Sequence, residues 1–162
     1  MILKPSKRFV VPLDERHENW LLKACEESQA TLEFLVLMRE RDRLHQLFRP
    51  DDGWPSEHFS LEQHQQDVQW QVSERLSRRS FAYSLWLPDE SELIGAVHLY
   101  PSVLPEVEVE VFFWLVAQCP FGEAEFERWL RRWLAARWRW KKPVFPGRDM
   151  PWADWPGVTY PW

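Results

Sequence analysis

The sequence has little of several features that would assign it to a specialised class of protein. Its 162 residues include only two cysteines, Cys25 and Cys119, without the spacing of a zinc ligand set or a disulfide framework. The longest apolar run, Val111 to Ala117, is far too short to cross a bilayer, and the N-terminus lacks the apolar core of a signal peptide. A formal net charge of −5 disfavours a dedicated nucleic-acid binder. We therefore expect a soluble, cytoplasmic protein with no metal site, no membrane segment and no nucleic-acid partner.

Common catalytic motifs are also missing. The sequence has no serine nucleophile elbow, no Walker loop and no pair of zinc-binding histidines flanking a Glu-x-x segment. The acids of Asp51-Asp52-Gly53 are not followed by the other oxygen ligands of a calcium loop, so this segment is predicted to be a turn. These absences exclude several hydrolase classes and P-loop nucleotidases.

Tryptophan is the most unusual feature of the composition. Seven of the twelve tryptophans lie in the last quarter of the chain: Trp129, Trp133, Trp138, Trp140, Trp152, Trp155 and Trp162. Basic residues lie between them, so an interfacial helix or a stacking surface for single-stranded nucleic acid is one interpretation. The helical spacing of Trp129 and Trp133 favours packing on a sheet instead, whereas Trp138 and Trp140 are left open. The Trp- and Pro-rich tail from about residue 150 is predicted to fold back on the sheet or to form a dimerisation patch.

The N-terminal half of the chain is predicted to be mainly helical. A short edge strand is expected over Phe9 to Val11, between two prolines. Apolar residues then recur at three- and four-residue spacings, which predicts one or two helices over 15–48. After a turn at 49–55, the segment Ser60-Leu-Glu-Gln has the pattern of a capping box and starts a helix that reaches about Arg78.

The C-terminal half combines strands with one long helix. Phe81–Leu87 and Leu93–Tyr100 are predicted to form a hairpin, and Val107–Val116 adds a third strand to this antiparallel meander. An amphipathic helix starts near Glu123, with acids at its beginning and bases towards its end, as the helix dipole favours. A short apolar piece, Val144-Phe145, follows it. The pattern predicts an α+β fold in a single domain over residues 1–162.

This order of elements resembles the GCN5-related N-acetyltransferase (GNAT) superfamily, and in particular a group of small bacterial GNAT-like proteins. The matching pieces are Trp54-Pro55 before Ser60-Leu61-Glu62, Phe81-Ala82-Tyr83, Gly95, Tyr100-Pro101, Trp133-Leu134 and Pro146-Gly147-Arg148. Together they cover residues 30 to 150 approximately. The resemblance implies a mixed sheet that contains the meander, splays after its fourth strand and carries helices on both faces.

The resemblance also implies where acetyl-CoA binds. In the superfamily, pantetheine lies beside the backbone of the splayed strand, which here means Trp114, Leu115 and Val116. The pyrophosphate lies on an Arg/Gln-x-x-Gly-x-Gly/Ala loop that opens the next helix, where free backbone amides bind anions.

In this sequence the loop departs from the superfamily pattern. The pattern falls on residues 119–124, with Cys119 at the first position, Gly122 at the glycine and Ala124 at the final small residue, and Gln118 lies one position before it. The candidate cofactor-binding residues of this turn are Gln118, Cys119, Phe121, Gly122 and Ala124. Cys119 replaces the expected Arg or Gln, and the proline that follows it removes one amide donor. Acids at the start of the helix either repel a phosphate or cap the helix themselves, so both interpretations stay open.

Candidate catalytic residues lie on two of the predicted strands. Glu106, Glu108 and Glu110 alternate along one strand face, and in an acetyltransferase a carboxylate there removes a proton from the acceptor amine. Glu110 lies deeper in the strand and is preferred to Glu108. His98 shares its face with Tyr100 and is a candidate base or proton relay. A solvated sheet face and a structural histidine are the alternatives.

Two hypotheses of function follow. The resemblance implies an N-acetyltransferase that transfers an acetyl group from acetyl-CoA to a small-molecule or peptide amine by direct attack, with Trp54, Tyr83 and Tyr100 as candidate acceptor contacts. The alternative is a GNAT-like protein that has lost the cofactor chemistry. Such a protein would act as a binding or homodimeric interaction protein through its Trp-rich C-terminal surface.

Overall fold

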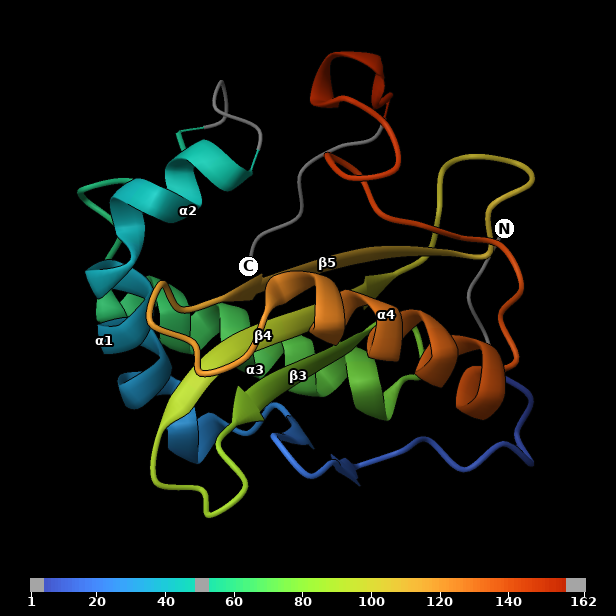
Figure 1. The fold of residues 1–162 in the computed structure, drawn as a ribbon, viewed down its shortest axis with the longest axis horizontal. Coiled ribbons are helices and arrows are strands. Elements are labelled where there is room, and N and C mark those ends of the chain that lie inside the picture. The colour runs from blue at the N-terminus through green and yellow to red at the C-terminus, as the bar shows by residue number, and fades with distance from the viewer. Residues whose placement is uncertain (1–4, 49–52, 157–162) are drawn as a thin grey trace.

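The computed structural model describes residues 5–48 and 53–156, which form a six-stranded sheet flanked by helices (Figure 1). The strands lie side by side in chain order: β1 (Asp14–Arg16), β2 (Leu21–Ala24), β3 (Phe81–Trp86), β4 (Leu93–Tyr100), β5 (Val109–Leu115) and β6 (Pro143–Val144). Neighbouring strands from β1 to β5 are antiparallel, whereas β5 and β6 run parallel. The predicted mixed sheet with an antiparallel meander is confirmed.

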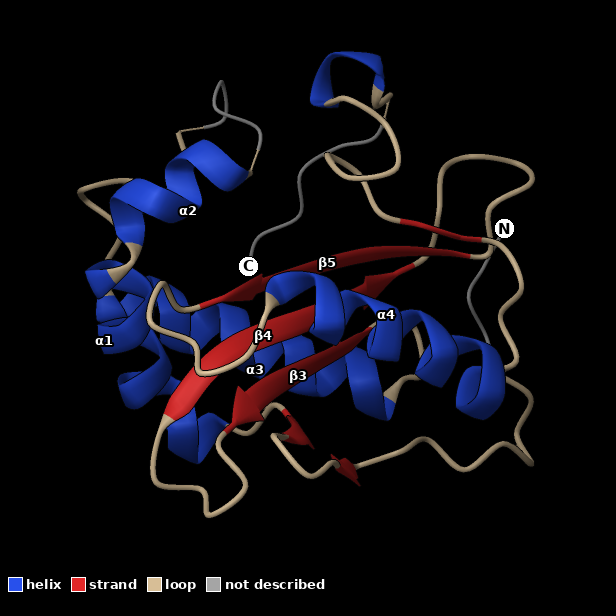
Figure 2. Cartoon of the chain, in the orientation of Figure 1, coloured by secondary structure: helices blue, strands red, loops and turns tan. Residues whose placement is uncertain are grey.

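Helices cover both faces of this sheet (Figure 2). The α-helices of the described residues are α1 (Ala30–Arg39), α2 (Arg41–Leu47), α3 (Leu61–Leu76) and α4 (Glu123–Trp133). One face carries α1 and α3, which pack on each other and on β4 and β3. The opposite face carries α4, whose Phe126 and Trp133 rings contact Phe113 and Tyr83 with centroids 5.4 and 5.5 Å apart. The α+β fold class predicted from the sequence is therefore correct.

The start of α3 is the capping box that the sequence predicts. The Gln63 amide donates to Ser60 Oγ at 3.1 Å, and the Ser60 amide donates to Gln63 Oε1 at 2.9 Å. Two amides that the helix itself cannot satisfy are thus paired. In the residues that the structure describes, no helix is both long enough and apolar enough to cross a membrane.

The prediction of helix over 15–48 is wrong in its first part. Trp20 and Leu21 have helical spacing with Ala24, but β2 begins at Leu21 and pairs with strands on both sides. A short apolar run fits a buried strand as well as a helix, and here the sheet decides. The predicted edge strand over Phe9 to Val11 is also wrong. That segment is held outside the sheet by Arg78, which donates to the Phe9 carbonyl at 2.5 Å.

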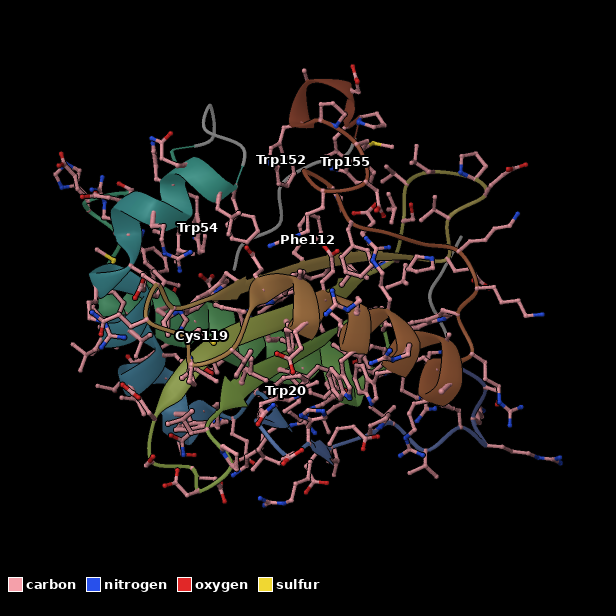
Figure 3. All side chains as sticks on the ribbon, viewed as in Figure 1. Trp20, Trp54, Phe112, Cys119, Trp152 and Trp155 are labelled. Atoms are coloured by element: carbon pink, nitrogen blue, oxygen red, sulfur yellow. The ribbon has the colours of Figure 1, made fainter. Side chains whose placement is uncertain are left out.

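The tryptophans of the C-terminal region pack inward. Trp133 and Trp138 are each 5% exposed, and Trp129 is partly buried against the core. The sequence predicts packing on the sheet for Trp129 and Trp133, and the structure shows that Trp138, which the sequence leaves open, is buried as well. In the tail, Trp155 is 3% exposed and Trp152 packs beside the sheet (Figure 3). Trp162 lies outside the described residues. The described tryptophans of this region therefore do not form the exposed surface that the interaction hypothesis requires.

Candidate active site

The sheet splays at the edge formed by β5. Pairing between β5 and β6 is limited to Val109 with Pro143 and Glu110 with Val144. The chain then turns away at Phe145, while β5 continues to Leu115. Among the described residues, the C-terminal half of β5 therefore has no strand partner on this edge, which fits the splayed strand that the resemblance implies.

Backbone carbonyls on the open edge of β5 are bound by arginine side chains. The Val116 amide donates to the Ile94 carbonyl of β4. Because alternate residues of a strand direct their backbone groups to opposite edges, Phe113 and Leu115 direct theirs away from β4. Arg148 donates to the Phe113 carbonyl at 3.4 Å, and Arg43 donates to the Leu115 carbonyl. Side chains of α2 and of the turn after β6 thus satisfy these two carbonyls of β5.

The turn between β5 and α4 leaves room for an anion. Gly122 is the residue before α4, no side chain caps the helix there, and a Cβ atom placed on Gly122 would meet nothing within 4 Å. Phe121 packs on Trp20 with ring centroids 4.6 Å apart, which anchors the turn. A groove of about 480 Å³ separates this turn from the loops that contain Asn19 and Pro88. The first amides of α4 therefore meet the steric requirement of a phosphate site.

The acids at the start of α4 are paired with neighbouring side chains. Glu123 Oε1 lies 2.6 Å from the guanidinium of Arg148, and Asn19 donates to Glu125 Oε1 at 3.5 Å. Cys119 is half-buried, and burial raises the pKa of its thiol, so it does not supply a thiolate here. Gln118 is exposed at the surface of the turn. The acidic turn is thus partly neutralised by a residue from outside the motif.

Glu110 is the most deeply buried carboxylate among the candidate bases. It is 0% exposed and lies at the point where β6 leaves β5. The Val103 amide donates to its Oε1 at 3.0 Å, whereas its Oε2 has no hydrogen-bond partner in the described part of the chain. Burial raises the pKa of Glu110, and hydrogen bonds from the Val103 amide and the Ser102 side chain act in the opposite direction. Burial thus shifts the proton affinity of Glu110 upwards, in the direction that a general base near neutral pH requires.

His98 and Tyr100 share the sheet face of Glu110. Tyr100 lies directly opposite Glu110 in the ladder of β4 and β5, and its hydroxyl is 3.3 Å from His98 Nδ1. Burial lowers the pKa of His98 to about 3, so its imidazole is neutral near pH 7. The predicted juxtaposition of these two side chains exists, but a neutral histidine of low basicity suits a positioning role better than that of a base.

An aromatic cluster that includes Trp54, Phe112 and Trp152 lies on the sheet face that also carries Glu110 (Figure 3). Trp152 stacks on Phe112, with centroids 6.2 Å apart and planes 11° apart. Phe48 contacts both Trp152 and Trp54, at centroid distances of 6.4 and 5.6 Å. The indole of Trp152 donates to the Leu47 carbonyl at 3.1 Å, which attaches the tail to α2. Trp54 thus belongs to a group of aromatic rings that extends to Phe112, two residues after Glu110 on β5.

Other predicted residues lie apart from this group. Tyr83 is on the α4 face of the sheet, where its hydroxyl donates to the Pro12 carbonyl at 2.7 Å. Glu108 precedes β5, and its Oε2 accepts the amides of Lys141 and Lys142 at 2.6 and 2.8 Å. Both residues therefore have structural partners that explain their position, and the structure does not bring either beside Glu110 and Tyr100.

The residues that sequence reasoning missed are arginines from distant segments. The sequence pattern indicates only a helix around Arg43, and Arg148 belongs to the Pro146-Gly147-Arg148 piece of the resemblance, which assigns it no role. Spacing within one motif cannot indicate side chains that arrive from α2 and from beyond β6. In the ranges 5–48 and 53–156, no group of three or more His, Cys, Asp or Glu side chains is arranged to hold a metal ion.

Comparison with solved structures identifies the fold. Residues of this chain superpose on a ribosomal-protein-S5-alanine acetyltransferase from Vibrio fischeri with a TM-score of 0.66 and 17% identity, over 88% of this chain and 79% of that chain. An acetyltransferase from Salmonella typhimurium that modifies the N-terminal serine of ribosomal protein L7/L12 gives a TM-score of 0.59 and 15% identity, over 80% and 67% of the two chains. The microcin C7 self-immunity acetyltransferase MccE, in complex with acetyl-CoA and AMP, gives a TM-score of 0.56 and 9% identity, over 72% and 63%.

No protein-family model and no curated protein sequence matches this chain. At these identities the structural likeness establishes the fold alone. The chain has the fold of the GNAT acetyltransferases.

Proposed function

We propose that the protein is an acetyl-CoA-dependent N-acetyltransferase in which the acceptor amine attacks the acetyl group of acetyl-CoA directly. The observation that carries this proposal is Glu110, a fully buried carboxylate at the point where β6 leaves β5 in a GNAT fold. Nothing in the pairing of the sheet requires an acid there. Its burial costs stability, which favours a role in chemistry over a structural one.

The cofactor would be held by two parts of the chain. The amides at the start of α4, next to the open space over Gly122, would bind the pyrophosphate, and the open edge of β5 at Phe113 and Leu115 would accept pantetheine in exchange for the arginine donors. Bound acetyl-CoA supplies a thioester-activated acetyl group. The residues present fit this group, provided that the charge of Glu123 stays neutralised by Arg148.

Glu110 would act as the general base. An amine is mostly protonated near pH 7 and attacks only after it loses a proton, and the raised pKa of Glu110 brings its proton affinity closer to that task. His98, neutral and linked to the Tyr100 hydroxyl, would hold the Tyr100 side chain in place on the sheet face that carries Glu110. No side chain needs to form a covalent intermediate.

The aromatic cluster indicates what approaches Glu110. Phe112 lies two residues after Glu110 on the same sheet face and stacks on Trp152, so aromatic rings, which attract cations, lie on the face where a protonated amine would bind. The acceptor, a small-molecule or peptide amine, is a proposal of class and not of identity. A cytoplasmic location and a homodimer remain predictions from the sequence.

Calorimetric titration with acetyl-CoA tests the first half of the proposal. A ligand at about 100 times its dissociation constant stabilises the fold by roughly 2.7 kcal/mol, so a thermal-shift titration provides a second readout. Absence of binding by both methods, with a folded circular dichroism spectrum, would retire the acetyltransferase proposal.

Release of CoA thiol in the presence of a panel of primary amines tests the second half. Glu110→Gln should reduce the rate by about 10²- to 10⁴-fold, the usual contribution of a general base, without weakening acetyl-CoA binding. Glu108→Gln is the matched control, because it changes an acid before the same strand and should leave the rate within a few-fold. An active Glu110→Gln variant would remove Glu110 from the mechanism.

A further inference from the structure

Arg148 lies between the two parts of the proposed acetyl-CoA site. It follows β6, and its guanidinium reaches back to the open edge of β5, where it donates to the Phe113 carbonyl at 3.4 Å. The same group pairs with Glu123, the first residue of α4, at 2.6 Å. Its central carbon lies 3.8 Å from the centre of the Phe113 ring. Only 21% of the side chain is exposed, so these contacts hold it in one place.

The turn before α4 needs a positive charge that its own residues do not provide. The segment 117–122 contains no Lys or Arg, and Glu123 and Glu125 follow it. A pyrophosphate on the first amides of α4 would therefore be repelled at short range by two carboxylates. Arg148 comes closest to correcting this, because its guanidinium contacts Glu123 directly and lies within 3.7 Å of Glu127 one turn later.

We propose that Arg148 is the cofactor-binding cation of this site and replaces the basic or amide residue that the turn lacks at Cys119. This inference rests on the proposed function. The guanidinium neutralises Glu123 and presents its remaining donors to the phosphates at the start of α4. Its hydrogen bond to the Phe113 carbonyl would be replaced by one from pantetheine when the cofactor occupies the strand edge.

Two variants of Arg148 and one of its ion-pair partner Glu123 test whether the positive charge of Arg148 contributes to CoA binding. Affinity for CoA is measured by calorimetry on the full chain, together with the thermal midpoint of each variant without ligand. Arg148→Gln should weaken CoA binding about tenfold or more, as expected for the loss of a charge-assisted contact. Arg148→Lys keeps the charge and should stay within about fivefold of wild type. Glu123→Gln should strengthen binding only two- to threefold, roughly, because Arg148 already offsets that carboxylate.

Arg131→Gln is the matched control. Arg131 lies on α4, pairs with Asp149 at 2.7 Å and stacks on Phe145 as Arg148 stacks on Phe113. It shares Glu127 with Arg148, each at 3.7 Å, but among the residues that the structure describes no ion pair joins it to Glu123, the acid at the start of α4. Its replacement should change CoA affinity by less than about twofold, since surface ion pairs remote from a ligand contribute little.

The outcomes separate this inference from the function on which it rests. A wild type that binds no CoA overturns both. A wild type that binds CoA, with Arg148→Gln equally tight or Arg131→Gln equally impaired, overturns the inference alone. A tenfold or larger gain in Glu123→Gln would show that Arg148 does not neutralise Glu123 and would also overturn it. That last measurement stands even where Arg148→Gln fails to fold.

Discussion

Glu110 of β5 lies directly opposite Tyr100 of β4, and the Tyr100 hydroxyl contacts His98 two residues earlier on its own strand. Three polar side chains thus share one buried sheet face, each less than 7% exposed. Burial shifts the pKa values of Glu110 and His98 in opposite directions, because it disfavours the charged form of each: it raises the pKa of Glu110 and lowers that of His98. Near neutral pH this leaves one potential acid–base group, the carboxyl of Glu110, on a sheet face that also carries a neutral imidazole.

The raised pKa of Glu110 makes stability depend on pH. The native state holds the Glu110 proton more tightly than the unfolded chain does, so this residue favours folding at acidic pH and the benefit is lost as pH rises through its raised pKa. Glu110→Gln has no such loss. We expect the variant to match wild type at about pH 4 and to be more stable at about pH 8, measured by urea unfolding at both values. A variant that is less stable than wild type at the higher pH would show that the carboxylate is stabilised in the native state.

Asp67 on α3 provides an independent test of the same physics. Burial raises its pKa to about 6, and the nearby His64 opposes the shift. The native state therefore binds more protons than the unfolded state between about pH 4 and 6, and stability from this residue falls as pH rises through that window. Asp67→Asn should raise the melting temperature at about pH 8 by a few degrees and leave it unchanged at about pH 4. An equal shift at both values would instead indicate an effect of packing.

Much of the fold could be predicted from the sequence because local signals agree with the tertiary structure. The capping box at Ser60 starts α3, the bounds of β4 match the predicted Leu93–Tyr100, and α4 begins at Glu123. The N-terminal region shows the limit of such signals. β2 lies between two other strands, so its residues are buried by neighbours that a local pattern of spacing does not reveal.

The candidate site was only partly predictable. Glu110, His98 and Tyr100 could be grouped because strand alternation fixes which residues share a face. Arg43 and Arg148 could not, since their contacts with β5 depend on how α2 and the turn after β6 approach the sheet. The resemblance groups Tyr83 with Tyr100, yet Tyr83 pairs with Val97 of β4, whose side chain lies on the face opposite that of His98 and Tyr100.

Trp152 attaches the C-terminal tail to the domain. Its indole stacks on Phe112 and donates to the Leu47 carbonyl, so Trp152→Ala removes both a large apolar contact and a hydrogen bond. We expect a loss of about 2 to 4 kcal/mol in the free energy of unfolding, below the cost for a fully buried tryptophan because part of this side chain is exposed. Leu76→Ala, at a position 73% exposed, should change stability by less than about 0.5 kcal/mol.

The same Trp152→Ala variant tests whether the tail prevents or forms a dimer. Light scattering after size exclusion gives the mass of each protein. A change from monomer to dimer would show that the docked tail covers an apolar surface on its own domain. An unchanged mass together with unchanged stability would contradict a structural role for Trp152.

Gly147 and Gly122 both lie in turns, and we expect substitution by alanine to change the free energy of unfolding in opposite directions at the two positions. Gly147 has a φ of +81°, and a Cβ atom there would lie 2.4 Å from the indole of Trp152, so Gly147→Ala adds both backbone strain and a steric clash. We expect it to lower the free energy of unfolding by about 1 to 3 kcal/mol.

Gly122 precedes α4 with a φ of −75° and open space around its Cβ position. Gly122→Ala should therefore leave stability unchanged or raise it by about 0.4 to 1 kcal/mol, because alanine restricts the unfolded chain more than glycine does. Gly122→Val should keep the fold yet weaken CoA binding, since a branched side chain would fill the space in which a phosphate approaches the amides of α4. Urea unfolding and calorimetry on the same preparations measure both effects. If Gly122→Val bound CoA as tightly as wild type, the phosphate would not lie on this turn, and the cofactor site would have to be sought elsewhere on the sheet edge.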